Sequence, residues 1–153
     1  GHVVSFTTDN MPVLTIAIAD ARYVNVTGDV MTGNLTAPTL IANTVSLEST
    51  DLSSEVSTTS STFPTELYSF DKATYNSAEL IVTATTGSNR HISKLLIVHN
   101  GTTAMATEFA TIYTNTALAT YAVAIQSGNV VINASATSSS ATTYQIAATL
   151  IKD

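Results

Sequence analysis

Histidine side chains are the groups of this chain best suited to bind a metal, because the sequence contains no cysteine. His91 and His99 lie eight residues apart in a segment that we expect to be one strand. The even spacing places both side chains on one face. At about 3.3 Å per residue they lie roughly 26 Å apart, so one strand cannot bring both to one metal ion. We therefore expect each histidine at the surface near a strand end, and no metal site.

Glu79 and Glu108 are the carboxylates that could share acid–base chemistry in the second half of the chain. Hydrolysis of a glycoside needs two carboxyl groups about 5–9.5 Å apart, and these two residues fall on different expected strands. Cross-strand ion pairs with basic residues such as Lys94 or Arg90 are the alternative, which we favour. The sequence also lacks the GxSxG, HExxH, GxGxxG and phosphate-loop patterns. We expect no catalytic residue, no cofactor and a protein that is not an enzyme.

Hydroxyl side chains dominate the composition. Serine and threonine account for 45 of the 153 residues, and charged residues for only 10%, whereas an ordinary soluble domain carries about 25% charged residues. Threonine favours strands and serine favours turns, so we expect a mainly β protein. Leucine, isoleucine, valine and phenylalanine make up 39 residues, which is enough for a hydrophobic core.

The charge is uneven along the chain. Residues 1–66 carry a net charge of −6, whereas residues 67–153 carry four acidic and four basic side chains. No basic patch is present to neutralise phosphates, so we expect no nucleic acid as a partner. No apolar run approaches the ~20 residues that span a bilayer, so we expect no membrane insertion. The charge step suggests a boundary near residue 66, and Gly1-His2 resembles a tag remnant. We therefore expect three parts: a tag remnant at 1–2, a shaft or connector region at 3–62 and a head domain at 63–153.

Residues 63–153 show the rhythm of short strands. Turn-forming residues recur every 11 to 15 residues, and Asn100-Gly101 is the strongest signal for a type I′ hairpin turn. This spacing without helical segments favours an antiparallel β-sandwich head of jelly-roll-like layout. We predict strands at 77–86, 91–99, 103–114, 118–125, 130–136 and 142–151, with a seventh at 66–70.

The segment 44–62 fits two interpretations, because Val45, Leu47, Leu52 and Val56 are its only apolar side chains. It could be a flexible linker. It could also be a narrow extended element that packs against identical copies, since one copy alone would not offset the entropy of ordering the backbone. Three copies with their few apolar side chains near a common axis would solve this problem for the whole of residues 3–62.

Residues 20–38 carry a more specific signal. Tyr23-Val24-Asn25, Gly28-Asp29, Met31-Thr32-Gly33 and Leu35 resemble a short motif of bacteriophage tail fibres, with Val30 where threonine is common. In fibres this motif belongs to a shaft-like region in which three identical chains wind together. The segment 94–115 is similar to segments of virion structural proteins from marine cyanobacterial phages. The resemblance implies a homotrimer with a short extended shaft followed by the head, and it implies no catalytic residue.

On this basis we expect a virion structural protein, the distal part of a trimeric phage tail fibre or appendage that attaches to the host cell surface. Its partners would be two further copies, other virion proteins, and a cell-surface glycan or protein. The chain would be made in the host cytoplasm and assembled into the virion. Two alternatives stay open: a neck, collar or capsid-decoration protein without a receptor, and a carbohydrate-binding or adhesin module.

Receptor contacts are not assigned to particular residues. Polar loops at 87–89, 100–102, 115–117, 127–129 and 138–142 are the expected source of weak contacts, which three copies would strengthen through avidity. We expect the tyrosines to serve packing more than recognition, because aromatic side chains on strands usually pack. They are Tyr23, Tyr68, Tyr75, Tyr113, Tyr121 and Tyr144.

Overall fold

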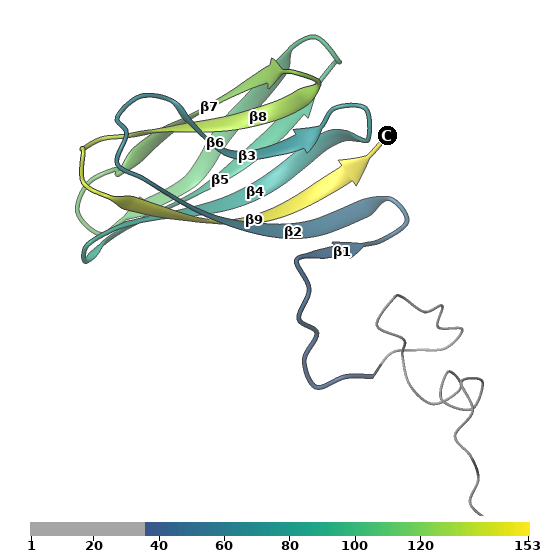
Figure 1. Ribbon diagram of the computed structural model, residues 1–153, viewed down its shortest axis with the longest axis horizontal. Coiled ribbons are helices and arrows are strands. Elements are labelled where there is room, and N and C mark those ends of the chain that lie inside the picture. Colours follow the sequence, from purple (N-terminus) through teal and green to yellow (C-terminus); the bar gives the residue numbers. More distant parts are fainter. Residues whose placement is uncertain (1–35) are drawn as a thin grey trace, which may run out of the picture. The chain divides into compact units, whose positions relative to one another are not determined.

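Strands dominate the part of the chain that the computed structural model describes, residues 36–153 (Figure 1). In chain order the strands are β1 (Thr44–Ser46), β2 (Thr50–Thr59), β3 (Thr65–Asp71), β4 (Tyr75–Thr86), β5 (Asn89–His99), β6 (Ala104–Tyr113), β7 (Ala119–Gln126), β8 (Asn129–Ala136) and β9 (Thr142–Lys152). All neighbouring strands pair antiparallel. The mainly β class expected from the sequence is confirmed for this part of the chain. In the same part, no helix is long and apolar enough to cross a membrane.

The strands form two sheets. The large sheet has the order β1-β2-β9-β4-β5-β6, and the small sheet has the order β3-β8-β7. Figure 1 shows the small sheet lying along one face of the large sheet. We call that face of the large sheet the inner face and the opposite one the outer face.

The hydrophobic core lies between the two sheets. Leu80 and Val82 of β4 are fully buried and belong to one cluster with Val130 and Ile132 of β8. Successive side chains of a strand point to opposite faces, so the residue between the two on β4, Ile81, belongs to the outer face. The inner face and the small sheet therefore enclose the core, and the outer face faces away from it.

The strands predicted within residues 63–153 are all present, as β3 to β9. The turn at Asn100-Gly101 is not the predicted type I′ turn. At Asn100-Gly101 only the glycine has a positive φ, of 87°, and the Asn100 side chain accepts hydrogen bonds from the backbone N–H groups of Thr102 and Thr103. The two-residue turn with positive φ at both positions is Ser127-Gly128, between β7 and β8. The asparagine therefore serves as a side-chain acceptor rather than as a left-handed residue.

Residues 44–59 belong to the large sheet. β2 pairs with β9 over ten residues, from Thr50 with Ile151 to Thr59 with Thr142. The segment is thus an extended element and not a linker, but its partner is a strand of the same chain. Residues 41–153 form one compact unit, so β1 and β2 share a unit with the expected head at 63–153, and the expected domain boundaries stay a prediction. The tail-fibre-like motif at 23–35 lies outside the described residues.

Candidate functional site

The outer face of the large sheet carries many exposed apolar side chains. The face includes ten large apolar residues that are 38–68% exposed: Leu52, Val56, Ile81, Ile92, Leu96, Val98, Met105, Phe109, Ile112 and Ile151. Monomeric soluble proteins rarely expose a contiguous apolar patch larger than a few hundred Å². This face is therefore the strongest candidate for an interaction surface in residues 36–153.

The strand register arranges these side chains in rows across the sheet. Residues that pair across antiparallel strands share a face. On β5 and β6, Val98 pairs with Met105 and Ile92 pairs with Ile112. The rows continue over β4, β9 and β2, where Leu52 pairs with Thr149 and Thr149 pairs with Glu79. The apolar side chains thus share one face over five neighbouring strands, most densely on β5 and β6, with polar residues such as Thr149 and Glu79 between them and Leu52 of β2.

A β-bulge places two of the largest side chains of β6 on the outer face. Phe109 and Ile112 are three residues apart, a spacing that would send them to opposite faces of a regular strand. The pairing of β5 with β6 shifts between Ile92 and Lys94, and Ala110 has a φ of 50°. A left-handed backbone costs an alanine about 1–2 kcal/mol. The bulge therefore keeps both apolar side chains on one face at the expense of local strain.

One ion pair lies within this apolar surface. Lys94 Nζ contacts the carboxylate of Glu79 and lies 5.9 Å from the centroid of the Phe109 ring. The expected cross-strand ion pair of Glu79 is confirmed, with Lys94 as its partner. Arg90 instead donates hydrogen bonds to the carbonyl groups of Gly87 and Asn89.

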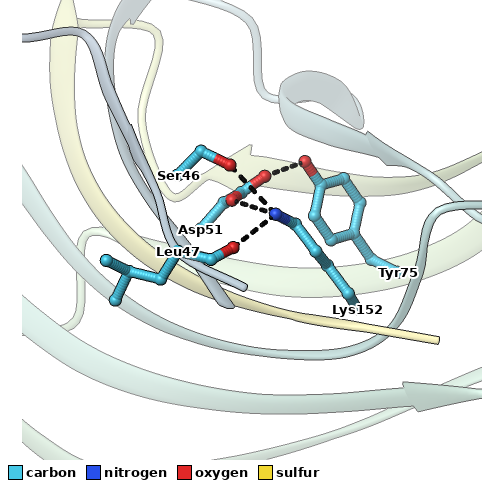
Figure 2. Close-up of polar contacts among 5 residues, drawn as sticks. All are labelled: Ser46, Leu47, Asp51, Tyr75 and Lys152. Atoms are coloured by element: carbon cyan, nitrogen blue, oxygen red, sulfur yellow. Dashed lines mark hydrogen bonds and ion pairs between the residues drawn. The ribbon is translucent and has the colours of Figure 1, made fainter. Parts of the chain in front are cut away.

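A partly buried polar cluster links the β1–β2 hairpin to β9 and β4 (Figure 2). The Asp51 carboxylate pairs with Lys152 Nζ at 2.8 Å and accepts a 2.6 Å hydrogen bond from the Tyr75 hydroxyl. Lys152 also donates to Ser46 Oγ and to the Leu47 carbonyl. The hydrogen bonds from Lys152, and then from Tyr75, lower the pKa of Asp51 to about 2. A carboxylate held in this way stabilises the fold and has no free oxygen for acid–base chemistry.

A groove of about 740 Å³ lies beside this cluster, between β2 and β3. Ser53, Tyr68, Asp71 and Tyr75 are among the residues that line it. Their polar groups already bond within the protein: Ser53 with Tyr68, Tyr75 with Asp51, and Asp71 with Thr74. This groove therefore offers a ligand less unused hydrogen-bonding capacity than its size suggests.

His91 lies in the core and not at the surface, which corrects the expectation from the sequence. Its side chain is 1% exposed, and its Nδ1 accepts a hydrogen bond from the backbone N–H of Leu118. The neutral ring then carries its hydrogen on Nε2, which lies 3.2 Å from Ser93 Oγ. Burial lowers the pKa of His91, although the nearby charge of Glu108 opposes the shift.

The contacts of His91 differ from those of a catalytic triad. The hydroxyl of Ser93 donates to Glu108 Oε1 at 2.6 Å, and Ser93 is fully buried. In a triad the histidine accepts the serine proton and the acid orients the histidine. Here the serine lies between the histidine and the acid, so the cluster does not activate a nucleophile. It links the inner face of β5 to β6.

The remaining candidate residues lie apart. Glu79 belongs to the outer face, whereas Glu108 faces Ser93 on the inner face, so the two carboxylates do not share a site. His99 is on the same face as His91, as expected from the spacing, and bonds to Tyr75 O and Gly101 N. Within residues 36–153, no group of three His, Asp or Glu side chains is placed to hold a metal ion.

The five polar loops do not form one contact surface. Residues 87–89, 115–117 and 138–142 follow the ends of β4, β6 and β8, whereas 100–102 and 127–129 follow the ends of β5 and β7. Since these two sets of strands run in opposite directions, the loops gather at opposite ends of the two-sheet unit (Figure 1).

The tyrosines mostly pack, as expected. Tyr144 is fully buried, and Tyr68, Tyr75 and Tyr121 pack against the core. Tyr113 is 49% exposed, but its ring contacts His91 edge-on. Tyr23 lies outside the described residues.

No family model matches the chain, and no curated protein matches it. Among solved structures, the chain is similar to the tailspike protein of Acinetobacter phage vB_ApiP_P1, with 16% sequence identity and a TM-score of 0.41. The match covers 82% of this chain and 26% of the tailspike chain. The chain therefore corresponds to about a quarter of that protein's length.

Proposed function

We propose that this chain is a non-enzymatic structural subunit of a bacteriophage virion, the distal part of a trimeric tail fibre or related appendage that attaches the particle to the host cell surface. In this proposal residues 41–153 are its β-sandwich head, and the jelly-roll-like layout stays a prediction. The tail-fibre-like motif from Tyr23 to Leu35 supports the placement in a phage tail.

The observation that carries the proposal is the apolar outer face of the large sheet. A chain in isolation leaves ten large apolar side chains of one sheet face exposed to water. Burial of apolar surface contributes about 25 cal/mol per Å², so association of copies through this face is favourable. The low content of charged residues, 10%, supports close packing of identical chains, because few like charges meet.

Sedimentation equilibrium of the full chain tests the oligomeric part of the proposal. We expect a mass of three chains at micromolar concentration, and a monomer at all concentrations would contradict it.

Binding of the fluorescently labelled trimer to a panel of marine cyanobacterial cells tests the attachment part. Saturable binding to at least one strain is expected. A stable trimer that binds none of them would contradict attachment and would favour a virion component without a receptor.

An assay for sugars released from a polysaccharide tests the non-enzymatic part. Release that disappears in Glu79→Gln or Glu108→Gln would contradict it.

A further inference from the structure

Resting on the proposed trimer, we infer that three copies bring their outer faces together around a common axis, with Glu79 and Lys94 as the polar centre that fixes their register. The proposed function requires three copies but names no interface. The charge, the width and the hollows of the outer face support this interface.

The charge of the outer face fits a second copy of the same chain. Glu79 and Lys94 are the charged residues in the middle of the face, and their charges cancel. Arg90, at the end of β5, adds one positive charge at the edge of the face. The middle of the face has no net charge, so identical faces can approach there with little repulsion.

The width of the face fits three copies. Five strands, β2, β9, β4, β5 and β6, carry the exposed apolar residues. At about 4.8 Å between strands the face is roughly 19 Å wide, and three such walls in a triangle lie about 6 Å from its axis. Packed sheets lie about 10 Å apart, so the side chains of each sheet extend about 5 Å from its backbone. Walls about 6 Å from the axis are therefore close enough for their side chains to meet there. Four walls would lie about 10 Å from the axis and would leave a channel.

Two hollows in the outer face offer space for side chains of a neighbouring copy. A hollow of about 310 Å³ is lined by Leu52, Ile81 and Ala147, and also by the ion pair of Glu79 and Lys94. A second hollow, of about 470 Å³, is lined by Leu96, Val98 and Met105. Such hollows can accept an apolar side chain, and interfaces of stable oligomers pack as densely as protein interiors.

The ion pair of Glu79 and Lys94 would lie at the centre of the assembly. β4 is the middle of the five strands, so Ile81 and Glu79 lie nearest the axis of the assembly. Three Glu79 carboxylates around an axis would repel one another unless each keeps a positive partner. Lys94 supplies that partner, and its loss would leave an uncompensated charge in a buried interface, which is strongly destabilising.

Sedimentation equilibrium on four variants of the full chain tests this inference. Glu79→Lys and Lys94→Glu reverse one charge each, and the double variant Glu79→Lys/Lys94→Glu restores a pair in the opposite order. Glu66→Lys is the matched control, because Glu66 is an exposed glutamate on β3 of the small sheet. Far-UV circular dichroism checks that each variant keeps its strands.

We expect both single reversals to raise the concentration for half-assembly by about 100-fold or more. The double variant should return to within about tenfold of the wild type, and Glu66→Lys should assemble normally. A wild-type trimer that Glu79→Lys and Lys94→Glu leave intact would overturn the inference while leaving the proposed function standing. A wild-type monomer would overturn the proposed function itself, and a face-to-face dimer would overturn the threefold arrangement.

Discussion

The two outward-facing sheet surfaces of this molecule are built from different residues. The outer face of the large sheet exposes ten large apolar side chains, whereas β3, β7 and β8 of the small sheet have no large apolar residue among those that are exposed. Outward positions of the small sheet hold residues such as Glu66, Thr120, Ala122 and Asn133. Both sheets bury apolar side chains in the same core. Folding of the single chain therefore does not explain why only one of the two outward surfaces is apolar. The contrast supports the proposal that the surface of the small sheet meets water and the outer face of the large sheet meets other copies.

The largest expected effect comes from placing a charge on each surface in turn. Leu96→Glu puts a carboxylate on the outer face of the large sheet, and Ala122→Glu puts one on the exposed face of the small sheet. Burial of an unpaired charge is expensive, so Leu96→Glu should weaken assembly by at least about 100-fold. Sedimentation equilibrium measures the difference. Equal assembly of the two variants would remove the contrast between the surfaces.

Neighbouring residues on β4 sharpen the distinction between core and interface. Leu80 is fully buried on the inner face, and Ile81 is 38% exposed on the outer face. In the Leu96→Glu background, at concentrations where that variant is monomeric, Leu80→Ala should lower the free energy of unfolding by about 2–5 kcal/mol. Ile81→Ala should lower it by about 1 kcal/mol or less. Urea titrations give both values, and similar losses would mean that the outer face contributes to the fold of the single chain.

The Asp51 cluster predicts a dependence on acid that belongs to the fold and not to assembly. The folded-state pKa of Asp51 is about 2, and an unfolded aspartate has a pKa of about 3.9. The unfolded state therefore binds more protons in this window, so the stabilisation is present above about pH 4 and is lost as the pH falls toward 2. Urea titrations between pH 2 and 5 should show a smaller loss of stability for Asp51→Asn than for the wild type. An unchanged slope would contradict the role of this carboxylate.

The smallest expected effect concerns the bulge that shapes the outer face. Ala110 has a left-handed backbone, with φ of 50°, so Ala110→Gly should raise the free energy of unfolding by about 1 kcal/mol. Ala106→Gly, at a regular position of the same strand, should lower it by about 0.5–1 kcal/mol. Thermal or urea unfolding measures both. The same sign for the two changes would contradict the strain assigned to the bulge.

The strands of the head were predictable because apolar and hydroxyl side chains alternate between clear turn signals. β2 was harder, because its inner face carries Asp51 and Ser53 instead of apolar residues. Its pairing with β9 depends on partners almost 100 residues away. Polar contacts with Tyr68, Tyr75 and Lys152 take the place of an apolar pattern there.

The burial of His91 could not be read from the sequence, since it depends on β6 and on the backbone of Leu118. The sequence carries a signal for the outer face. Leu95-Leu96-Ile97-Val98 is apolar at consecutive positions, and a strand that is apolar on both faces is typical of one buried on both faces. Under the proposal, this run belongs to a strand that other copies cover on its second face.

Protection of a single thiol tests most directly whether other copies cover the outer face. The chain has no cysteine, so Leu96→Cys on the outer face and Thr120→Cys on the small sheet each provide a unique reactive group. In the full chain at micromolar concentration, a maleimide should label Thr120→Cys rapidly and Leu96→Cys at least about tenfold more slowly, because a covered thiol is shielded from the reagent. Dilution below the assembly concentration should remove that protection. Equal labelling rates at all concentrations would contradict the claim that this face is an interface.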